Sequence, residues 1–513
     1  MASAGPRRVA DAPESAIGNG AVTGALHPET ASYDRAAMSR RVLLGSLLVV
    51  CTGFAAFALA HMFPPAPYGL ADDWRVFYAA AQVIAHGGNP YDAATIHAAE
   101  QTAQHYASVQ PSLDDFADLP IVGLFLRAFS WLPYWWSYAV FTALGMVVAG
   151  ASLRLWMREL GWPSAGLWVL GALCSWPLLV GALSGQFDLL LLGATVAALL
   201  LMRRDRPWLS GLCMAAVLLK PHILWPLPLL LATSWVGDMP QLRRFALSAG
   251  GVLVAGTVAG FLLVPHSGSF FAHLLNFEST VTAVQPDLAG IPGLVAHLPH
   301  GALLGDGIAV VGVAGVLVLA VASIRLPALR ALPADRRHLI PLVGLAFWLA
   351  CTPYAHPNDD VLLFPLLVAV VGEAGRRLDT RWLEVGMIVS FGLIACFVVA
   401  PVVGAVLVVL GCLGWTWSWR RISGAAAASL ALAAVVLLPD IWPFHLVPVS
   451  LTPIAVTLVL VAGGLELRRL SGAPTAAAAL SAGAPPPPPS RGGWCYAQRR
   501  PGVPDWLRSH PRT

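Results

Sequence analysis

Long apolar runs separated by short polar segments recur along this chain from residue 42 to residue 467. An apolar run of about 17–25 residues is long enough to cross the hydrocarbon core of a bilayer as a helix. The runs that we expect to span the membrane are 42–63, 134–156, 163–183, 186–203, 242–264, 303–324, 338–354, 358–373, 382–400, 402–419, 423–439 and 448–467. The pattern therefore predicts an all-α polytopic membrane bundle with about 12–14 membrane helices.

One further stretch, 208–233, is ambiguous, because it can form a single span or two short helices broken at Lys220-Pro221. Proline removes a backbone hydrogen-bond donor and disfavours helical geometry in the residue before it. Ahead of the run 134–156, residues 119–132 are expected to form a short interfacial helix.

Arginines decide between the two alternatives, because positively charged residues stay on the cytoplasmic side in short loops. They cluster after alternate runs, at Arg40, Arg41, Arg154, Arg158, Arg203, Arg204, Arg206, Arg243, Arg244, Arg325, Arg330, Arg336, Arg337, Arg376, Arg377, Arg381, Arg420, Arg421, Arg468 and Arg469. If 208–233 enters the membrane and returns, all these clusters and both chain termini are cytoplasmic. A single crossing would move every later cluster outside, so we favour the broken pair.

The outer side of the membrane then receives two long loops, 64–133 and 265–302, and the short turns 184–186, 354–358 and 440–447. Most of the histidines lie in these segments. Loops that are held by a rigid scaffold commonly carry function. We therefore expect a multi-pass protein of the plasma membrane whose active site is extracytoplasmic.

The composition agrees with a membrane protein, because 57% of the 513 residues are hydrophobic and only 11% are charged, whereas about a quarter of a soluble domain is charged. Residues 1–41 and the Ala/Pro-rich tail 471–513 are expected to be disordered and cytoplasmic. Between them we expect a catalytic membrane module at 42–375 and further membrane helices at 376–470. The first apolar run is too long for a signal-peptide core.

Several function classes lack their sequence signatures. The seven cysteines form no CxxC pair, so neither a disulfide framework nor a zinc site is indicated. The sequence contains no phosphate-binding loop, HExxH or GxSxG motif. The histidines lack metal-ligand spacing, so a divalent metal is possible but not indicated. No basic cytoplasmic domain suggests a nucleic-acid partner.

Two adjacent aspartates, Asp72 and Asp73, precede the sequence VFYAAAQVIA, whose amphipathic helical pattern ends at Gly87-Gly88. One of them is expected at the N-cap of this helix, near the membrane surface, since aspartate is a preferred cap. A carboxylate at this interface can also take a proton from an alcohol. The two interpretations are compatible, and we expect one catalytic aspartate and one that supports it.

Lys220 is the only lysine of the chain, and it lies inside the apolar stretch LCMAAVLLKPHILWPL. A charge inside a membrane segment costs roughly 2.5–3.5 kcal/mol on insertion scales and indicates a functional role. The alternative is that the side chain snorkels to the interface. We favour an anion site in which the ammonium group binds a phosphate.

Two outer turns carry further polar residues. In the first, Gln186 and Asp188 lie at the start of a predicted span, and Asp188 could pair with Lys220 or cap the helix. In the second, TPYAHPNDD, His356 lies between two structure-breaking residues, and the following aspartates Asp359 and Asp360 could be plain helix caps. His356 could donate a hydrogen bond to a phosphate or a sugar hydroxyl.

Three segments in this order resemble glycosyltransferase family 87: DDWRVFYAAAQVIAHGGNPYD, SGQFDLLLLGATVAALLLMRRDRPWLSGLCMAAVLLKPHILWPLPLLL and TPYAHPNDDVLLFPLL. The resemblance extends over roughly residues 42–375. It implies a membrane fold of the GT-C type, a hexose (mannose in the best-known members) carried on a polyprenyl phosphate, an outer-face lipid or glycan acceptor, and transfer with inversion.

The resemblance also implies roles for individual residues. Asp73 would be the general base, Lys220 a ligand of the donor phosphate, and His356 and Gln186 would assist. Asp72, Asp188, Tyr78 and His222 complete the set of candidates. Many relatives carry Tyr-Pro-Pro where this chain has Asp118-Leu119-Pro120, and Asp188 stands where an amide is common. These departures concern the acceptor more than the reaction.

A transporter or flippase of a lipid-linked sugar is the alternative from another class, since broken helices and intramembrane charges also occur in transporters. Transporter sites lie near the midplane, often between repeated halves, whereas here the polar groups crowd toward one face and no repeat is visible. A third possibility is an inactive family member that serves as a scaffold, but the retained Lys220 argues against it.

Overall fold

The computed structural model describes residues 71–103, 115–162, 176–281, 289–295 and 298–375, together with a few isolated residues near 170 and 465. The predicted spans 42–63, 382–400, 402–419 and 423–439 lie outside the described residues, as do nearly all of 448–467, the N-terminus 1–41 and the tail 471–513.

Every described element is a helix, and no strand occurs in the described ranges, which confirms the all-α fold class. The α-helices are α2 (Asp72–Ala85), α3 (Ala93–Ala103), α4 (Pro120–Leu126), α5 (Tyr134–Glu159), α7 (Trp176–Ser184), α8 (Asp188–Arg203), α9 (Pro207–Leu212), α10 (Pro221–Leu224), α11 (Pro226–Ala232), α12 (Met239–Leu263), α13 (Phe270–Val281), α14 (Ile291–Val295), α15 (Gly301–Arg325), α16 (Pro327–Arg330), α17 (Leu339–Cys351) and α18 (Phe364–Gly375). Short 3-10 helices adjoin them: η1 (Arg127–Phe129), η2 (Cys213–Leu218), η3 (Thr233–Trp235), η4 (Ser267–Ser269) and η5 (Pro357–Leu363).

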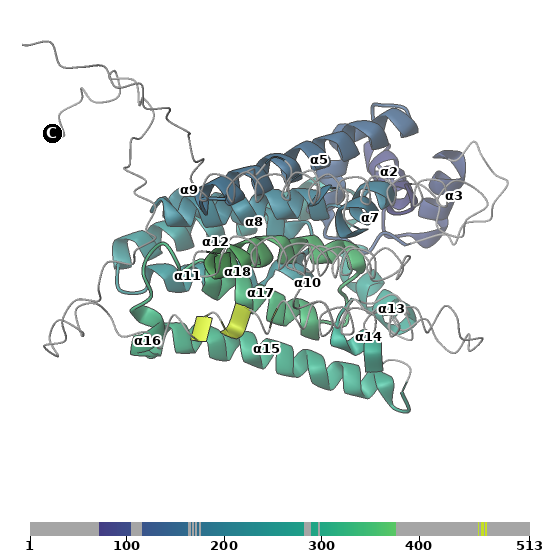
Figure 1. Cartoon of the computed structure of the whole chain (residues 1–513). Helices are drawn as coiled ribbons and strands as arrows, with labels where there is room; N and C mark the ends of the chain where they lie inside the picture. The colour runs from purple at the N-terminus through teal and green to yellow at the C-terminus, as the bar shows by residue number, and fades with distance from the viewer. Residues whose placement is uncertain are drawn as a thin grey trace, which may run out of the picture.

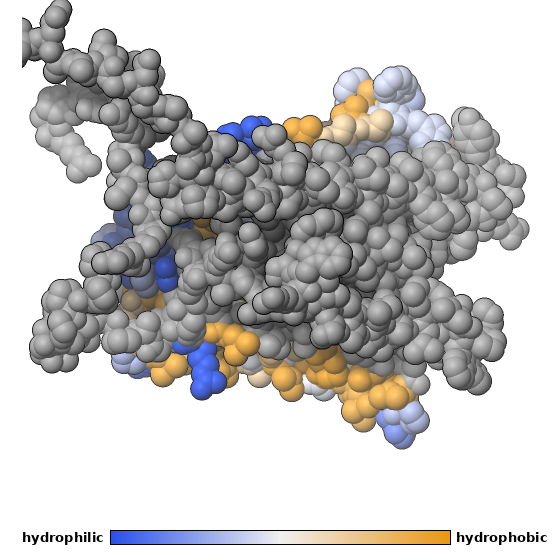
Figure 2. Space-filling model, viewed as in Figure 1, coloured by the Kyte–Doolittle hydropathy of each residue, from blue (hydrophilic) through white to orange (hydrophobic). Residues whose placement is uncertain are grey.

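Within the described residues, three helices, α5, α12 and α15, are long and apolar enough to cross a bilayer, with 26, 25 and 25 residues. They coincide with the predicted spans 134–156, 242–264 and 303–324. Their outward faces are apolar: Val147 is 68% exposed, Leu262 77% and Val310 68%. Figure 2 shows this hydrophobic surface along α15 at the lower edge of the molecule. Such faces are stable when lipid covers them.

The helices run between two ends of the molecule (Figure 1). We call the end with α2, α3 and α13 the loop end, and the end with α9, α11 and α16 the arginine end. At the arginine end, Arg203 pairs with Glu159 at 3.4 Å and donates to the backbone oxygen of Asp335. Arg337 donates to the carbonyl of Ser234 at 3.0 Å. The arginine clusters of the described chain therefore share one end.

Two arginines, Arg75 and Arg127, lie at the loop end instead. Arg75 is buried and pairs with Glu100 of α3 at 3.1 Å. Its charge is therefore neutralised within the protein, so it does not act as a topology signal.

The stretch 208–233 is broken at Lys220-Pro221, as predicted. Lys220 has φ −147° and ψ 71°, outside helical geometry, and α10 begins at Pro221. Asp205, which precedes the stretch, accepts hydrogen bonds from Trp235 at 3.1 Å and Gln241 at 3.3 Å, which follow it. The stretch therefore starts and finishes at the arginine end, as expected for the broken pair.

Helix α2 differs from the prediction in two ways. Its N-cap is Ala71, with φ 63° and no side-chain cap, so neither aspartate occupies that position. Tertiary contacts fix this residue instead: its N–H donates to Leu183 at 2.7 Å and its carbonyl accepts from Tyr134 at 3.0 Å. The helix has the amphipathic pattern that the sequence predicts, but it is enclosed on most sides, because α3, α4 and α7 pack against it and most of its residues are buried.

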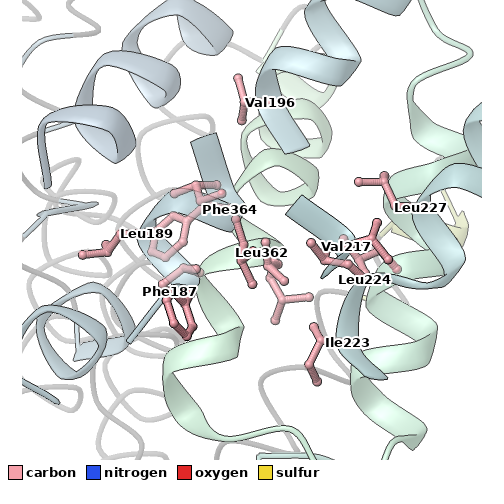
Figure 3. Packing of buried hydrophobic residues seen from close by; sticks show 14 of the residues in the cluster. Phe187, Leu189, Val196, Val217, Ile223, Leu224, Leu227, Leu362 and Phe364 are labelled. Carbon is pink, nitrogen blue, oxygen red and sulfur yellow. The ribbon is translucent and has the colours of Figure 1, made fainter. Parts of the chain in front are cut away.

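The core around the middle of the molecule joins three regions that are distant in sequence (Figure 3). Phe187 and Val196 come from the start and middle of α8, Ile223 and Leu224 from the broken stretch, and Phe364 from α18; all are buried. Burial of one such apolar side chain contributes about 1.5–3 kcal/mol. This packing holds the start of α8, the break at Lys220 and η5 together.

Candidate active site

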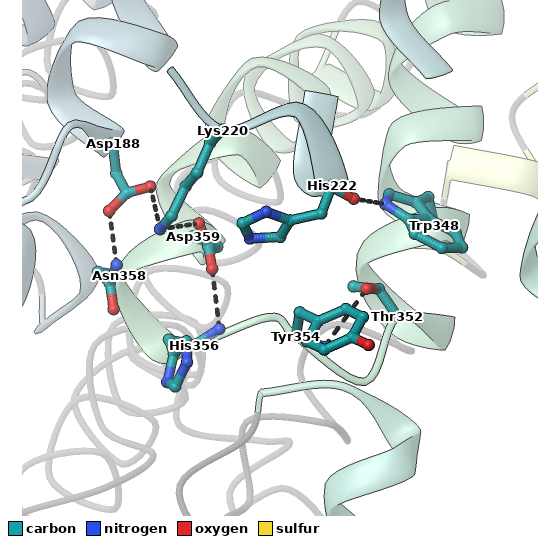
Figure 4. A network of polar contacts seen from close by, with 9 residues as sticks. All are labelled: Asp188, Lys220, His222, Trp348, Thr352, Tyr354, His356, Asn358 and Asp359. Atoms are coloured by element: carbon teal, nitrogen blue, oxygen red, sulfur yellow. Dashed lines mark hydrogen bonds and ion pairs between the residues drawn. The ribbon is translucent and has the colours of Figure 1, made fainter. Parts of the chain in front are cut away.

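Lys220 lies at the centre of a buried ion cluster (Figure 4). Its Nζ donates to Asp188 Oδ1 at 3.0 Å and to Asp359 Oδ1 at 2.8 Å. Asn358 donates to the other oxygen of Asp188 at 2.5 Å. Lys220 is 7% exposed and both aspartates are 0% exposed. The predicted Asp188–Lys220 pair is confirmed, and Asp359 joins it.

The break in the helix explains how the lysine reaches both carboxylates. Because Pro221 cannot donate a backbone hydrogen bond, the chain leaves helical geometry at Lys220. Asp188 is the first residue of α8, and Asp359 lies in the first turn of η5. With one ammonium and two carboxylates in contact, the cluster carries a net negative charge when all three groups are ionised.

Exposed and half-buried side chains lie beside this buried cluster. His222 is exposed, and its ring packs edge-on against the ring of Tyr354, with the ring centroids 5.8 Å apart. Trp348 fixes the backbone of His222 by donating to its carbonyl at 2.7 Å. His356 is half-buried, and its backbone N–H donates to Asp359 Oδ2 at 2.8 Å. Asp359 therefore both caps η5 and binds the lysine.

Asp73 reaches the same site from the start of α2. The side-chain amide of Gln186 donates to its carboxylate, while Gln186 Oε1 has no hydrogen-bond partner in the described part of the chain. Burial raises the pKa of Asp73 above its usual value, and the hydrogen bond from Gln186 and the charges of His356 and Lys220 lower it in part. The structure therefore brings the start of α2, the turn at Gln186, the turn at His356 and Lys220 into one site.

Two candidates from the sequence stand apart. The hydroxyl of Tyr78 donates to the carbonyl of Leu132 at 2.9 Å, and its ring packs edge-on against Tyr134 at 5.3 Å. Tyr78 thus ties α2 to the segment before α5, and we leave it out of the proposed site. The side chain of Asp72 is outside the described part of the structure.

The turn that carries Gln186 depends on Gly185, which has φ +80° and whose Cβ, if present, would lie 2.6 Å from Trp74 Cβ. Gly185→Ala should therefore lower the thermal unfolding midpoint, with about 1–2 kcal/mol from the left-handed conformation alone and more from the clash. Gly161 is the matched control, since it has φ +77° and nothing within 4 Å. Equal midpoints for Gly185→Ala and Gly161→Ala would refute the close-approach argument.

Residues 119–353 match the family model described as glycosyltransferase family 87. This match confirms the family, over a shorter range than the expected 42–375, and only the second of the three resembling segments lies wholly inside it. This part of the chain is a glycosyltransferase family 87 segment. No curated protein and no solved structure gives a significant match to the chain. The family match and the apolar helices together indicate a membrane glycosyltransferase.

The matched segment holds only part of the site. It includes Gln186, Asp188, Lys220 and His222, whereas Asp73 precedes it and His356 follows it. The glycosyltransferase family 87 segment therefore supplies the ion cluster's lysine and one of its carboxylates, and the flanking chain supplies the proposed base and η5. In the described ranges, no group of three or more His, Cys, Asp and Glu side chains is arranged to hold a metal ion.

Besides Asp359, the structure adds Asp118 to the residues that the sequence suggests for the site. Asp118 is half-buried just before α4. Burial raises the pKa of Asp118 to about 7, Lys220 lowers it in part, and the negative charge of Asp73 raises it further. In the sequence, the sign of a special role for Asp118 was that Asp118-Leu119-Pro120 stands where many relatives carry Tyr-Pro-Pro.

Proposed function

We propose that this glycosyltransferase moves a hexose, mannose in the first instance, from a polyprenyl-phosphate donor to a hydroxyl group of a lipid or glycan acceptor, with inversion. The observation that carries the proposal is the convergence of Asp73, Gln186, His356 and Lys220 from separate parts of the chain. A carboxylate, an amide, an imidazole and an ammonium group are the side chains that such a transfer needs.

Asp73 is the general base in this proposal. The acceptor oxygen attacks the anomeric carbon, its proton passes to the Asp73 carboxylate, and the bond between the anomeric carbon and the phosphate oxygen breaks with its electron pair on the phosphate. Burial and the resulting raised pKa make Asp73 a better proton acceptor than an exposed aspartate. Gln186 orients the carboxylate, and its unpaired Oε1 can accept a hydrogen bond from the substrate.

The leaving phosphate needs positive charge and hydrogen-bond donors. Two donors of the Lys220 ammonium are committed to Asp188 and Asp359, so one N–H remains for a phosphate oxygen. Because the ion cluster is net negative, Lys220 does not suffice alone. In our proposal the imidazoles of His356 and His222, which are more exposed than the cluster, supply the other donors.

An activity assay of the full chain tests the proposal. The purified protein in proteoliposomes is given radiolabelled polyprenyl phosphate mannose, polyprenyl phosphate glucose or GDP-mannose, with octyl α-mannoside as acceptor. We expect transfer from a polyprenyl phosphate hexose and none from the nucleotide sugar. Use of GDP-mannose would overturn the donor assignment. Movement of intact donor across the bilayer without transfer would favour the flippase.

We also propose that the site faces the extracytoplasmic side of the plasma membrane. The support is the gathering of arginines such as Arg203 and Arg337 at the opposite end. Alkaline phosphatase, which is active only outside the cytoplasm, should be active when fused after Pro299 and inactive when fused after Arg330. The reverse result would contradict the orientation while leaving the transferase assignment intact.

A further inference from the structure

Asp118 lies where the outer loop meets the membrane helices. The hydroxyl of Tyr91 donates to its backbone carbonyl at 3.0 Å, and Phe116, two residues earlier, is 1% exposed. Helix α4 begins two residues later, at Pro120. The position of the Asp118 backbone is therefore set by contacts on both sides.

The first turn of α4 lies close to the break that carries Lys220. A Cβ on Gly256 of α12 would lie 2.3 Å from Leu218 Cδ1 and 3.9 Å from Ile121 Cγ1. Leu218 precedes Lys220 by two residues, and Ile121 follows Asp118 by three. A Cβ on Gly260 would come within 2.5 Å of the backbone nitrogen of Ile121. These two glycines let α12 press the start of α4 against the broken stretch.

The carboxylate of Asp118 lies within electrostatic range of the site. It interacts electrostatically with both Asp73 and Lys220, and no hydrogen bond from the described part of the chain reaches it. A half-buried carboxylate without a hydrogen-bond donor is costly, because it loses water without replacing it. The positive charge of Lys220 does not compensate, since Asp188 and Asp359 already share it.

We propose that Asp118 is a substrate-binding residue, which accepts a hydrogen bond from a hydroxyl group of the donor sugar or of the acceptor. This inference rests on the proposed transfer between a polyprenyl-phosphate sugar and a hydroxyl acceptor. A carboxylate accepts hydrogen bonds from hydroxyls strongly, so Asp118 helps to select a hydroxyl-bearing substrate and to hold it before Asp73 removes a proton.

Kinetics of Asp118→Asn and Asp118→Ala in the proteoliposome assay test this role. We expect kcat/KM to fall about 10- to 100-fold, as for loss of a charged hydrogen bond, through KM rather than kcat. The KM that rises identifies the source of the hydroxyl, either polyprenyl phosphate mannose or octyl α-mannoside. The deoxy substrate that lacks the contacted hydroxyl should have a higher KM with the wild-type protein. With Asp118→Ala, this deoxy substrate and the complete substrate should have the same KM, because the hydrogen bond is already lost.

The pH dependence gives a second readout. The groups that face Asp118 are Asp73 from α2 and Lys220 from the break, with the Tyr91 hydroxyl on its backbone. Burial raises the pKa of Asp118 to about 7, so the group is neutral below this pH and anionic above it. Substrate KM should therefore fall as pH rises through about 7 in the wild type, and this change should be absent in Asp118→Asn. A change in the protonation of Asp73, the proposed general base, would instead change kcat, so the two titrations are distinguishable.

Asp306→Asn is the matched control, because Asp306 is an exposed aspartate near the loop end of α15. It should leave both KM values unchanged. Wild-type KM values in Asp118→Asn and Asp118→Ala, or a fall in kcat alone, would overturn the inference. A wild-type protein that transfers no sugar would instead refute the proposed function, so the two failures are distinguishable.

Discussion

Asp73→Asn is expected to reduce sugar transfer by roughly 10²- to 10⁴-fold, the usual contribution of a general base. Asparagine has nearly the same shape and can still contact Gln186, but it cannot accept the proton of the acceptor hydroxyl. Burial raises the pKa of the Asp73 carboxyl group and so favours uptake of this proton, whereas the amide of asparagine has no basic oxygen that could take it up. The measurement is kcat with saturating polyprenyl phosphate mannose and octyl α-mannoside in proteoliposomes.

Two comparisons make this result interpretable. Asp306→Asn carries the same chemical change on an exposed surface and should transfer sugar at the wild-type rate. The thermal unfolding midpoint of Asp73→Asn should stay near that of the wild type, because removing a buried charge does not leave a charge unpaired. Transfer at the wild-type rate by Asp73→Asn would eliminate Asp73 as the base.

Lys220→Met is expected to be the most destabilising single substitution in the described chain. It leaves the carboxylates of Asp188 and Asp359, both 0% exposed, without their cation. Breaking a buried ion pair by removing one partner costs about 3–5 kcal/mol, because the remaining charge is uncompensated. The loss should appear as a lower unfolding midpoint of the detergent-solubilised protein and as poor recovery from membranes.

A combined variant separates the structural part of this effect from the catalytic part. Lys220→Met with Asp188→Asn and Asp359→Asn removes all three charges, and should regain much of the lost stability. It should remain inactive if Lys220 also binds the donor phosphate. An unfolding midpoint unchanged by Lys220→Met alone would contradict the stabilising role of the ion cluster. Normal transfer by the stable triple variant would remove Lys220 from the reaction.

The membrane helices were the most predictable part of the fold. The runs 134–156, 242–264 and 303–324 each appear as one long helix, within a few residues of the expected bounds. The bilayer core offers backbone N–H and C=O groups no water to bind, so a long apolar run satisfies them within itself by forming a helix. The return of 208–233 was predictable for a similar reason, because the arginines limit which ends can lie on the same side.

The outer loop was less predictable. The aspartates at the start of α2 have the sequence of a helix cap, yet Ala71 takes the cap position because Leu183 and Tyr134 hold its backbone. The amphipathic pattern also suggested a helix near the membrane surface, but α3, α4 and α7 pack against α2, and the rings of Phe129 and Phe141 pack against the buried Trp74. Neither contact can be read from local sequence, since both join residues far apart in the chain.

The sequence alone was sufficient to predict a helical membrane protein, an unusual charge at Lys220 inside an apolar stretch, and arginine clusters on one side of the membrane. These conclusions follow from length, apolarity and charge, which act locally. Only the tertiary structure decided which groups meet: Asp359 joins Asp188 on Lys220, Gln186 holds Asp73, and Asp118 enters the site. The physical reason is that ion pairs and buried carboxylates depend on distances between helices, which packing sets and sequence spacing does not.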